Sequence, residues 1–310
     1  MLYSIFKFGA FLAVKIYCKK TIVNFDKNTS FSNPKLIACN HPNSFFDAIL
    51  IAVHYPKPIY FLARGDAFNK PLVAKLLNAI NLIPIYRLSE GKENLTKNDA
   101  TFKKCIELLS KNKTILIFSE GICVNEWNLR PLKKGTARLS LMAFENQIAN
   151  LKIQPTNINY SSFKKNPKVA EINFNAEFIP TKPNSGEEAK FYNEFNQELK
   201  DGMLSRMLDK EGIQKLKKST SPSKKAILFL PACIGYLLNY GIYIFFKKKV
   251  TKKTKNTVFY DSVLFGLLLI CYPIIVTIIA IIVLLLFNFP AALVTFLLFP
   301  ITAWCYKELK

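Results

Sequence analysis

The residues best suited to chemistry lie in one short stretch, Asn40–Asp47. A histidine titrates near neutral pH, and a carboxylate beside it can fix its tautomer and stabilise its protonated form. The chain has only two histidines, so His41 is the leading candidate for a general base, with Asp47 as its partner. The apolar run Leu36–Cys39 predicts a buried strand before this stretch, and Ala48–Val53 predicts a helix after it. The pair is therefore expected in a strand-to-helix turn at the rim of a sheet.

A purely structural role is also open for one member of this pair. Ser44 followed three residues later by Asp47 matches the capping box, in which the acidic side chain binds an amide at a helix start. Asp47 alone could serve that purpose, but the pattern gives no role to His41. The two roles are compatible, because a helix N-terminus also helps to keep a carboxylate ionised beside an imidazole.

Short apolar runs alternate with helical stretches from Pro34 to about Phe178. Strands that alternate with helices predict an α/β fold, with a largely parallel sheet flanked by helices, over residues 23–218. The polar stretch Glu187–Leu216 predicts a helix packed on the outside. Strands are expected at Leu36–Cys39, Pro58–Leu62, Leu82–Tyr86, Thr114–Phe118, Leu151–Ile158 and Ala170–Phe174, and helices at Pro71–Ile80, Asp99–Ser110 and Lys134–Phe144.

The beginning of the chain is expected to lie on a membrane. Residues 1–22 are mostly apolar, with Lys7, Lys15 and Lys19 within one arc of a helical wheel. This distribution predicts an amphipathic helix in the bilayer interface.

Residues 219–310 are expected to form a membrane-associated region. Residues 262–306 carry no charge, and at about 20 residues for each crossing this length predicts a hairpin of two spanning helices. Residues 226–246 are also uncharged, but a proline and two glycines interrupt them and lysines flank both ends. This pattern favours a re-entrant or interfacial segment. Because positive residues mark the cytoplasmic side, the catalytic domain is expected on the cytoplasmic face of the inner membrane.

The composition indicates an anionic membrane as a partner. The net charge is +22, from 43 Lys+Arg against 21 Asp+Glu, while 50% of the residues are hydrophobic. A nucleic-acid binder usually lacks long uncharged segments, so no nucleic acid is expected as a partner. The seven cysteines show no CxxC-like spacing, so the sequence predicts neither a metal site nor a disulfide framework.

Two further patterns follow or interrupt predicted strands. Ile83–Arg87 ends in an arginine, whose planar fork suits phosphate, although a surface arginine after an edge strand is an equal alternative. Pro155 interrupts a predicted strand, which suggests an edge strand or a bulge.

A third group follows the strand Thr114–Phe118. Glu120 could hold a hydroxyl, orient a cation or serve only as a turn residue. Gly121 permits close approach of a backbone, and Lys133 and Gly135 stand near a helix start, where anions bind well. α/β domains place their sites beyond the ends of strands, so these residues are candidates for substrate binding.

Taken in order, these blocks resemble the glycerolipid acyltransferase family, which includes the lysophosphatidate and glycerol-3-phosphate acyltransferases. The resemblance covers roughly Pro34 to Tyr160, in the order and spacing of the family. The first block of the family is similar to Asn40–Asp47, the second to Ile83–Arg87, the third to Phe118–Gly121 with Leu132–Gly135, and the fourth to Gln154–Pro155.

The sequence departs from the family pattern in the first and third blocks. Five residues separate the histidine from the aspartate, where the family has four. This difference affects the expected geometry of the turn more than the expected roles of the two residues. Ser119 stands in the place of a proline, and the arginine of that block has no counterpart. The phosphate contacts would therefore move to Arg87, Lys133 or Arg130.

The resemblance implies a membrane-bound O-acyltransferase without a cofactor or a metal. A fatty acyl group would pass from acyl-CoA or acyl-carrier protein to a hydroxyl of a glycerophosphate or lysophospholipid acceptor. His41 would take the hydroxyl proton while Asp47 holds its tautomer, and backbone amides would stabilise the oxyanion. The substrate-binding residues implied are Arg87, Glu120, Gly121, Lys133 and Gly135.

Two other functions stay open. A lipid hydrolase would use Ser44 or Cys39 as a nucleophile near His41, although the chain has no G-x-S-x-G motif. A non-catalytic membrane lipid-binding protein could keep the same fold.

Overall fold

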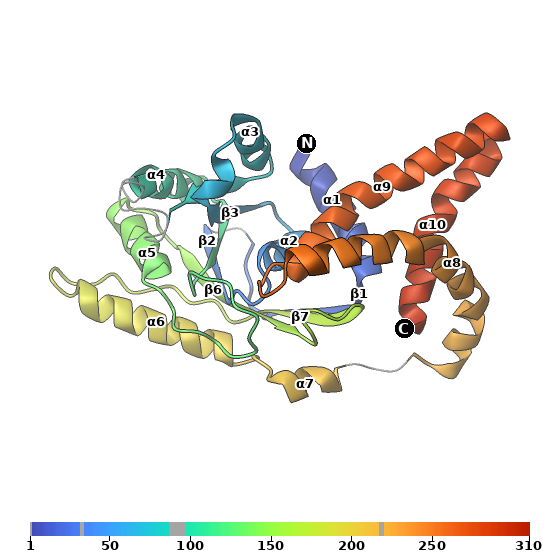
Figure 1. Ribbon diagram of the computed structural model, residues 1–310. Helices are drawn as coiled ribbons and strands as arrows, with labels where there is room; N and C mark the ends of the chain where they lie inside the picture. Colours follow the sequence, from blue (N-terminus) through green and yellow to red (C-terminus); the bar gives the residue numbers. More distant parts are fainter. Residues whose placement is uncertain (1, 32–33, 87–96, 217–219) are drawn as a thin grey trace.

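The computed structural model describes residues 2–31, 34–86, 97–216 and 220–310. Within these ranges seven strands form one sheet, in the order β1-β7-β6-β2-β5-β3-β4 (Figure 1). The strands are β1 Cys18–Phe25, β2 Lys35–Cys39, β3 Ile59–Arg64, β4 Leu82–Ile85, β5 Thr114–Phe118, β6 Lys152–Tyr160 and β7 Lys168–Phe174. The α-helices are α1 Leu2–Tyr17, α2 Phe45–His54, α3 Pro71–Ala79, α4 Lys97–Ser110, α5 Gly135–Glu145, α6 Glu188–Leu204, α7 Lys210–Lys215, α8 Pro222–Lys253, α9 Tyr260–Leu286 and α10 Phe289–Leu309.

The sheet is largely parallel, as the sequence predicts. Every neighbouring pair of strands runs in parallel except β6 and β7. The sequence does not predict β1, which extends the sheet beside β7. The sequence pattern does not indicate this strand, because Lys19 and Lys20 continue the pattern of basic residues along the N-terminal helix.

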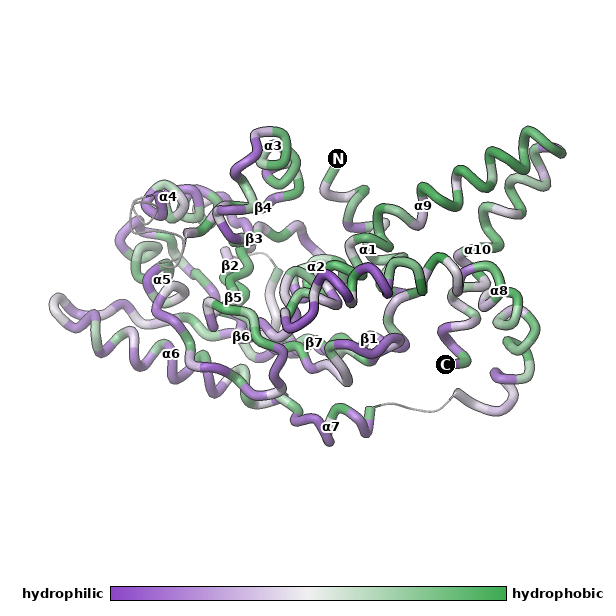
Figure 2. Tube along the Cα trace, viewed as in Figure 1, coloured by the Kyte–Doolittle hydropathy of each residue, from purple (hydrophilic) through white to green (hydrophobic). Residues whose placement is uncertain are grey.

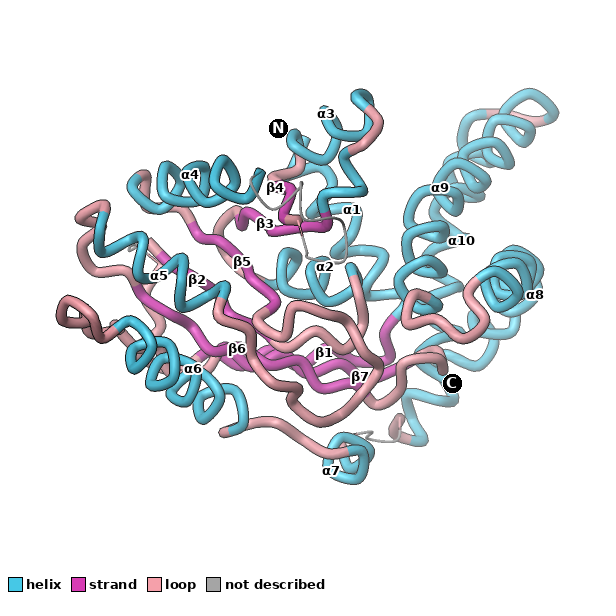
Figure 3. The backbone as a smooth tube through the Cα atoms, turned by 60° about the vertical axis from the view of Figure 1, so that its left-hand side comes forward, coloured by secondary structure: helices cyan, strands magenta, loops and turns pink. Residues whose placement is uncertain are grey.

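Helices cover both faces of the sheet (Figure 3). Successive strand residues point to opposite faces, so each face collects its own apolar side chains. In β2, Ile37 and Cys39 belong to a core with α1, α2, α8 and α9, whereas Leu36 and Ala38 belong to a core with α4, α5 and α6. All residues of β2 are buried, as expected for an inner strand that is covered on both sides.

Among the described residues, α8, α9 and α10 are long and apolar enough to cross a membrane. Hydrophobic residues predominate along α9 and α10, which extend together away from the sheet (Figure 2). Many of their large apolar side chains are exposed, such as Leu285 at 80% and Leu286 at 71%. Large exposed apolar patches mark surfaces for membranes or partners, so these helices fit membrane association.

Helix α8 differs from the expected re-entrant hairpin. It runs without interruption through Pro231, Gly235 and Gly241. At Gly235 a side chain would collide with the backbone of Thr302 in α10, so this glycine permits close helix packing. The position of residues 226–246 in the interface or across the bilayer stays a prediction.

Candidate functional site

The candidate site lies where strands β2, β5 and β6 end. β2 pairs in parallel with both neighbours, so the three carboxyl ends meet at one edge of the sheet. His41 follows β2, Glu120 follows β5, and Tyr160 is the last residue of β6. The Asn40 side chain accepts from the Ile158 N–H at 2.9 Å and donates to the Ile158 carbonyl at 3.2 Å. This pair of hydrogen bonds to β6 fixes the chain immediately before the histidine.

The turn after β2 starts α2 without a capping box. Ser44 is the N-cap at φ 55°, and its side chain makes no capping hydrogen bond. Its N–H donates to Cys123 Sγ at 3.0 Å instead of to the carboxylate of Asp47. That carboxylate accepts from the Asn43 N–H at 2.8 Å, one residue earlier than the box requires. Ser44 and Asp47 therefore do not form the capping box that their spacing suggests.

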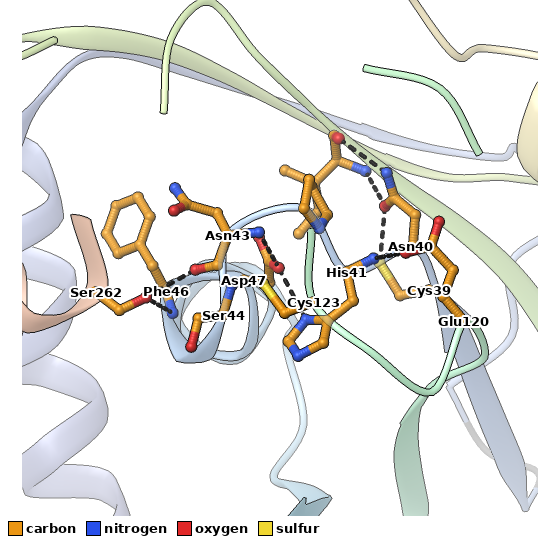
Figure 4. Close-up of polar contacts among 12 residues, drawn as sticks. Cys39, Asn40, His41, Asn43, Ser44, Phe46, Asp47, Glu120, Cys123 and Ser262 are labelled. Atoms are coloured by element: carbon orange, nitrogen blue, oxygen red, sulfur yellow. Dashed lines mark hydrogen bonds and ion pairs between the residues drawn. The ribbon is translucent and has the colours of Figure 1, made fainter. Parts of the chain in front are cut away.

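His41 and Asp47 contact each other directly (Figure 4), with 3.0 Å between Nδ1 and Oδ2. The Asp47 side chain is fully buried, and that of His41 is 12% exposed. When Asp47 is ionised and the ring is neutral, the carboxylate can only accept a hydrogen bond, so this contact favours the tautomer with its hydrogen on Nδ1 and a lone pair on Nε2. Among the described residues, Nε2 has no hydrogen-bond partner. The imidazole is therefore arranged to accept a proton at Nε2.

Three donors hold the buried carboxylate of Asp47. Tyr160 donates its hydroxyl to Oδ1 at 2.7 Å, while the Asn43 N–H and the imidazole of His41 meet Oδ2. Burial raises the pKa of Asp47 above its ordinary value, because it removes water from the charged form. The three donors act in the opposite direction, since each stabilises the ionised form. They offset part of the cost of keeping a charge at this depth.

Glu120 and Phe118 fix the backbone and the ring of the histidine. The carboxylate of Glu120 accepts from the His41 N–H at 2.9 Å and from the Arg130 N–H at 3.0 Å. Burial raises the pKa of Glu120, and the two backbone donors counteract that shift. The Phe118 ring stacks on the imidazole with 3.8 Å between the centroids and 14° between the planes. Glu120 thus positions His41, while its contact with a substrate stays a prediction.

Gly121 and Lys133 lie against each other beside this turn. Gly121 has φ +72°, and a Cβ there would lie 3.0 Å from Lys133 Cγ, so both conformation and space require glycine. Lys133 donates its N–H to the Ser119 carbonyl at 2.7 Å. The Ser119 hydroxyl pairs with Thr136 Oγ1 at 2.9 Å. Gly135, the first residue of α5, has open space where a side chain would lie.

Arg87 lies outside the described residues, so its predicted phosphate contact stays a prediction. It follows β4, which lies three strands from β2 in the order of the sheet. At about 4.8 Å between neighbouring strands, the ends of β2 and β4 are about 14 Å apart.

Sequence reasoning missed two residues that bind the carboxylate of Asp47. Tyr160 resembles any buried aromatic residue at the end of an apolar strand, and the sequence contains no signal for its contact. Asn43 stands inside the first block, where an amide between a histidine and an aspartate is a usable signal.

Replacing Tyr160 by phenylalanine removes one donor from Asp47. The loss of one neutral hydrogen bond is expected to lower kcat about three- to tenfold with little change in KM. Initial rates in membranes measure this effect. Tyr272→Phe is the matched control, because that hydroxyl donates to Asn239 in α8 at 2.7 Å. An equal loss in both variants would show that the contact with Asp47 is not responsible.

Part of the chain is similar to known proteins. Residues 20–159 match the family model described as Acyltransferase. Over 129 residues the chain is 24% identical to a chloroplastic 1-acyl-sn-glycerol-3-phosphate acyltransferase of Arabidopsis thaliana, covering 42% of this chain and 34% of that protein. It is 23% identical over 129 residues to a chloroplastic protein of the same description from Brassica napus, covering 42% and 36%.

The chain therefore spans about a third of the length of these curated relatives. A crystal structure of the 1-acyl-sn-glycerophosphate acyltransferase PlsC from Thermotoga maritima is similar at a TM-score of 0.42 and 17% identity. The similarity covers 65% of this chain and 74% of that one.

Proposed function

We propose that this chain acylates a glycerolipid, because residues 20–159 match the family model described as Acyltransferase. The fatty acyl group comes from the thioester of acyl-CoA or acyl-carrier protein. The acceptor is a hydroxyl of a glycerophosphate or a lysophospholipid. The plant relatives are named for the acceptor 1-acyl-sn-glycerol-3-phosphate, which supports a phosphate-bearing substrate here. The observation that carries the proposal is the contact of His41 with Asp47 at the end of β2.

The arrangement of the pair supplies each proton transfer of the reaction. Nε2 of His41 takes the proton of the acceptor hydroxyl as its oxygen attacks the thioester carbonyl, and Asp47 balances the imidazolium. A tetrahedral intermediate forms, and backbone amides stabilise its oxyanion. The C–S bond then breaks, the ester remains, and the sulfur leaves with the proton that the imidazolium returns.

The binding of the substrates is proposed for the groups around the pair. Lys133 and Arg87 bind the phosphate of the acceptor, because cations recognise phosphate by charge and hydrogen bonds. Glu120 holds the histidine, Gly121 lets the Lys133 side chain lie against this turn, and the open space at Gly135 leaves room for the approach of a substrate. The exposed apolar surfaces of α8, α9 and α10 favour a bilayer setting, in which the acyl chain stays in lipid. We propose that the catalytic domain faces the cytoplasmic side of an anionic inner membrane, because lysines flank the apolar segments and positive residues mark that side.

Hydrolysis of a lipid by Cys39 is less well supported. The Cys39 side chain is fully buried in β2, and burial raises the pKa of its thiol well above the ordinary value. A thiol in that state is a poor nucleophile, because the thiolate is the reactive form. Ser44 is the other candidate nucleophile. It lies three residues after the histidine, which is close in sequence for a catalytic pair, and its N–H is bound to Cys123 Sγ.

Membranes that contain the full chain test the proposal with labelled acyl-CoA, labelled acyl-carrier protein and a panel of acceptors. Mass spectrometry of the lipids is expected to show acylated product only when a phosphate-bearing acceptor is present. Release of free fatty acid without an acceptor would support the hydrolase instead. Retained lipid binding without turnover for any donor and acceptor would leave a lipid-binding protein.

Arg87→Ala tests the phosphate contact. Loss of one charge-assisted hydrogen bond is expected to raise KM for the phosphate-bearing acceptor about tenfold and to leave KM for the acyl donor unchanged. Lys75→Ala in α3, which removes a cation outside the proposed site, serves as the control. An unchanged KM would remove Arg87 from the phosphate site.

A further inference from the structure

The first turn of α9 contacts the turn that carries His41 and Asp47. Ser262 Oγ donates to the carbonyl of Asn43 at 2.8 Å and accepts from the Phe46 N–H at 3.3 Å (Figure 4). Asp261 Oδ2 accepts from the side-chain amide of Asn43 at 2.6 Å. Asp261 and Ser262 are both fully buried. The two segments are more than 200 residues apart in the chain, as the separation of 219 between Asn43 and Ser262 shows.

These contacts act on the orientation of Asp47 through one residue. Asn43 donates its N–H to Asp47 Oδ2, the same oxygen that meets the imidazole. The carbonyl of Asn43 and its side-chain amide nitrogen are both bound to α9. Ser262 also binds the N–H of Phe46, the residue before Asp47. The start of α9 thereby holds Asn43 and Phe46, two residues of the turn that precedes Asp47.

Asp261 is itself held by partners from two other elements. Lys168 of β7 lies 2.5 Å from its Oδ2, with both side chains fully buried, and Tyr17 of α1 donates to its Oδ1 at 2.5 Å. A buried carboxylate needs such partners, because an unpaired charge at this depth is strongly destabilising. Four segments of the chain therefore meet at Asp261: α1, β7, the turn after β2 and α9.

Packing supports the same contact between α9 and α2. The rings of Phe46 and Phe265 lie 4.9 Å apart between centroids, and a Cβ at Gly266 would lie 3.1 Å from the Phe45 ring. The hydrogen bonds of Asp261 and Ser262 are therefore surrounded by apolar side chains of α2 and α9. Hydrogen bonds in such surroundings are stronger than in water and hold their geometry.

We infer that Asp261 and Ser262 are positioning residues for the proposed reaction, which hold Asp47 against His41 through Asn43. The inference rests on the proposed function for its activity readout. It places a necessary part of the site at the start of α9, outside residues 20–159 that match the family model. Neither residue touches the reacting atoms.

Ser262→Ala in the full chain tests the inference. Without the hydroxyl, kcat is expected to fall about tenfold while KM for donor and acceptor stays within about twofold. Thr302→Val is the matched control, because this buried hydroxyl of α10 bonds only to carbonyls of its own helix among the described residues. A kcat for Ser262→Ala equal to that of the control overturns the inference.

A second comparison keeps the test independent of a folding defect. In the presence of Lys168→Met, Asp261→Asn keeps an oxygen that can accept from Asn43, whereas Asp261→Leu does not. Both double variants lack the buried charge pair. At equal melting temperature, the leucine variant is expected to have a kcat about tenfold below that of the asparagine variant. Equal values of kcat would exclude the positioning role of Asp261.

Hydrogen exchange separates a failure of the inference from a failure of the proposed function. The amides of residues 40–47 are expected to exchange faster in Ser262→Ala than in Thr302→Val, whether or not the protein transfers acyl groups. Unchanged exchange in both variants contradicts the inference. Absent acyl transfer in the unmodified chain contradicts only the proposed function.

Discussion

Replacing His41 by alanine is expected to lower kcat for acyl transfer about 10³-fold, within the range of about 10² to 10⁴ for general-base catalysis. The His41 imidazole contacts the buried Asp47 through Nδ1, and its Nε2 has no hydrogen-bond partner among the described residues. Removing it leaves the acceptor hydroxyl protonated at the moment of attack. Single-turnover measurements with labelled donor in membranes give the effect on the chemical step.

The second histidine of the chain provides the control. His54 ends α2, and its Nδ1 contacts the carbonyl of Leu50 at 2.9 Å, within the same helix. His54→Gln is expected to retain kcat within about threefold, because neutral side chains outside the site contribute little to the transition state. Equal losses in His41→Ala and His54→Gln would mean that loss of folding, and not loss of the base, explains the result.

Asp47→Asn is expected to lower kcat about 10²- to 10³-fold and to leave the fold intact. The neutral amide cannot balance the charge of the imidazolium, so the effect falls mainly on the transition state. KM for the donor is expected to stay within about threefold. Steady-state kinetics on membrane preparations with matched protein content measure both constants.

The stability of the same variant has a defined dependence on pH. Burial raises the pKa of Asp47, so its contribution to stability is present below its ordinary value of 3.8 and is lost as the pH rises through the folded value. Asparagine carries no such cost. The melting temperature of Asp47→Asn relative to the unmodified chain is therefore expected to rise between about pH 4 and about pH 7. A relative melting temperature that falls over this range would indicate that the ionised carboxylate stabilises the fold.

Much of the sheet domain can be predicted from the sequence because its signals are local. Runs such as Leu36–Cys39 and Ile115–Phe118 are apolar throughout, as expected of inner parallel strands that are covered on both faces. The structure has strands at both places. It also brings together His41 and Asp47, which the sequence pairs because they share one short turn.

The exceptions depend on contacts that no local pattern contains. Pro155 suggests an edge strand or a bulge, but β6 lies between β7 and β2, so the edge alternative is wrong. The ladder between β6 and β7 covers Thr156–Tyr160, and Pro155 stands just before it, where its carbonyl accepts from the Asn175 N–H at 2.9 Å. A proline is tolerated at that point because no ladder bond to β7 requires its missing N–H.

The same reason explains why Asp261 and Tyr160 could not be found from the sequence. Asp261 resembles a favourable acidic residue in the first turn of a helix, and only the fold shows that it binds Asn43, Lys168 and Tyr17. Tyr160 bonds to Asp47 across 113 positions of the chain. Partners separated by such distances are set by the arrangement of the elements.

The attachment of the turn to the first residues of α9 has a consequence in a bilayer. Helix α9 has 27 residues and is about 40 Å long, whereas the hydrocarbon layer is about 30 Å thick. A helix of this length adapts to bilayer thickness by tilting or by altering the lipids around it. Because the turn is fixed to its end, we expect the tilt of a membrane-spanning α9 to set the height of the imidazole above the lipid surface. In the proposed reaction, lipid composition would then determine how far the acceptor hydroxyl must rise from the headgroup layer to be deprotonated.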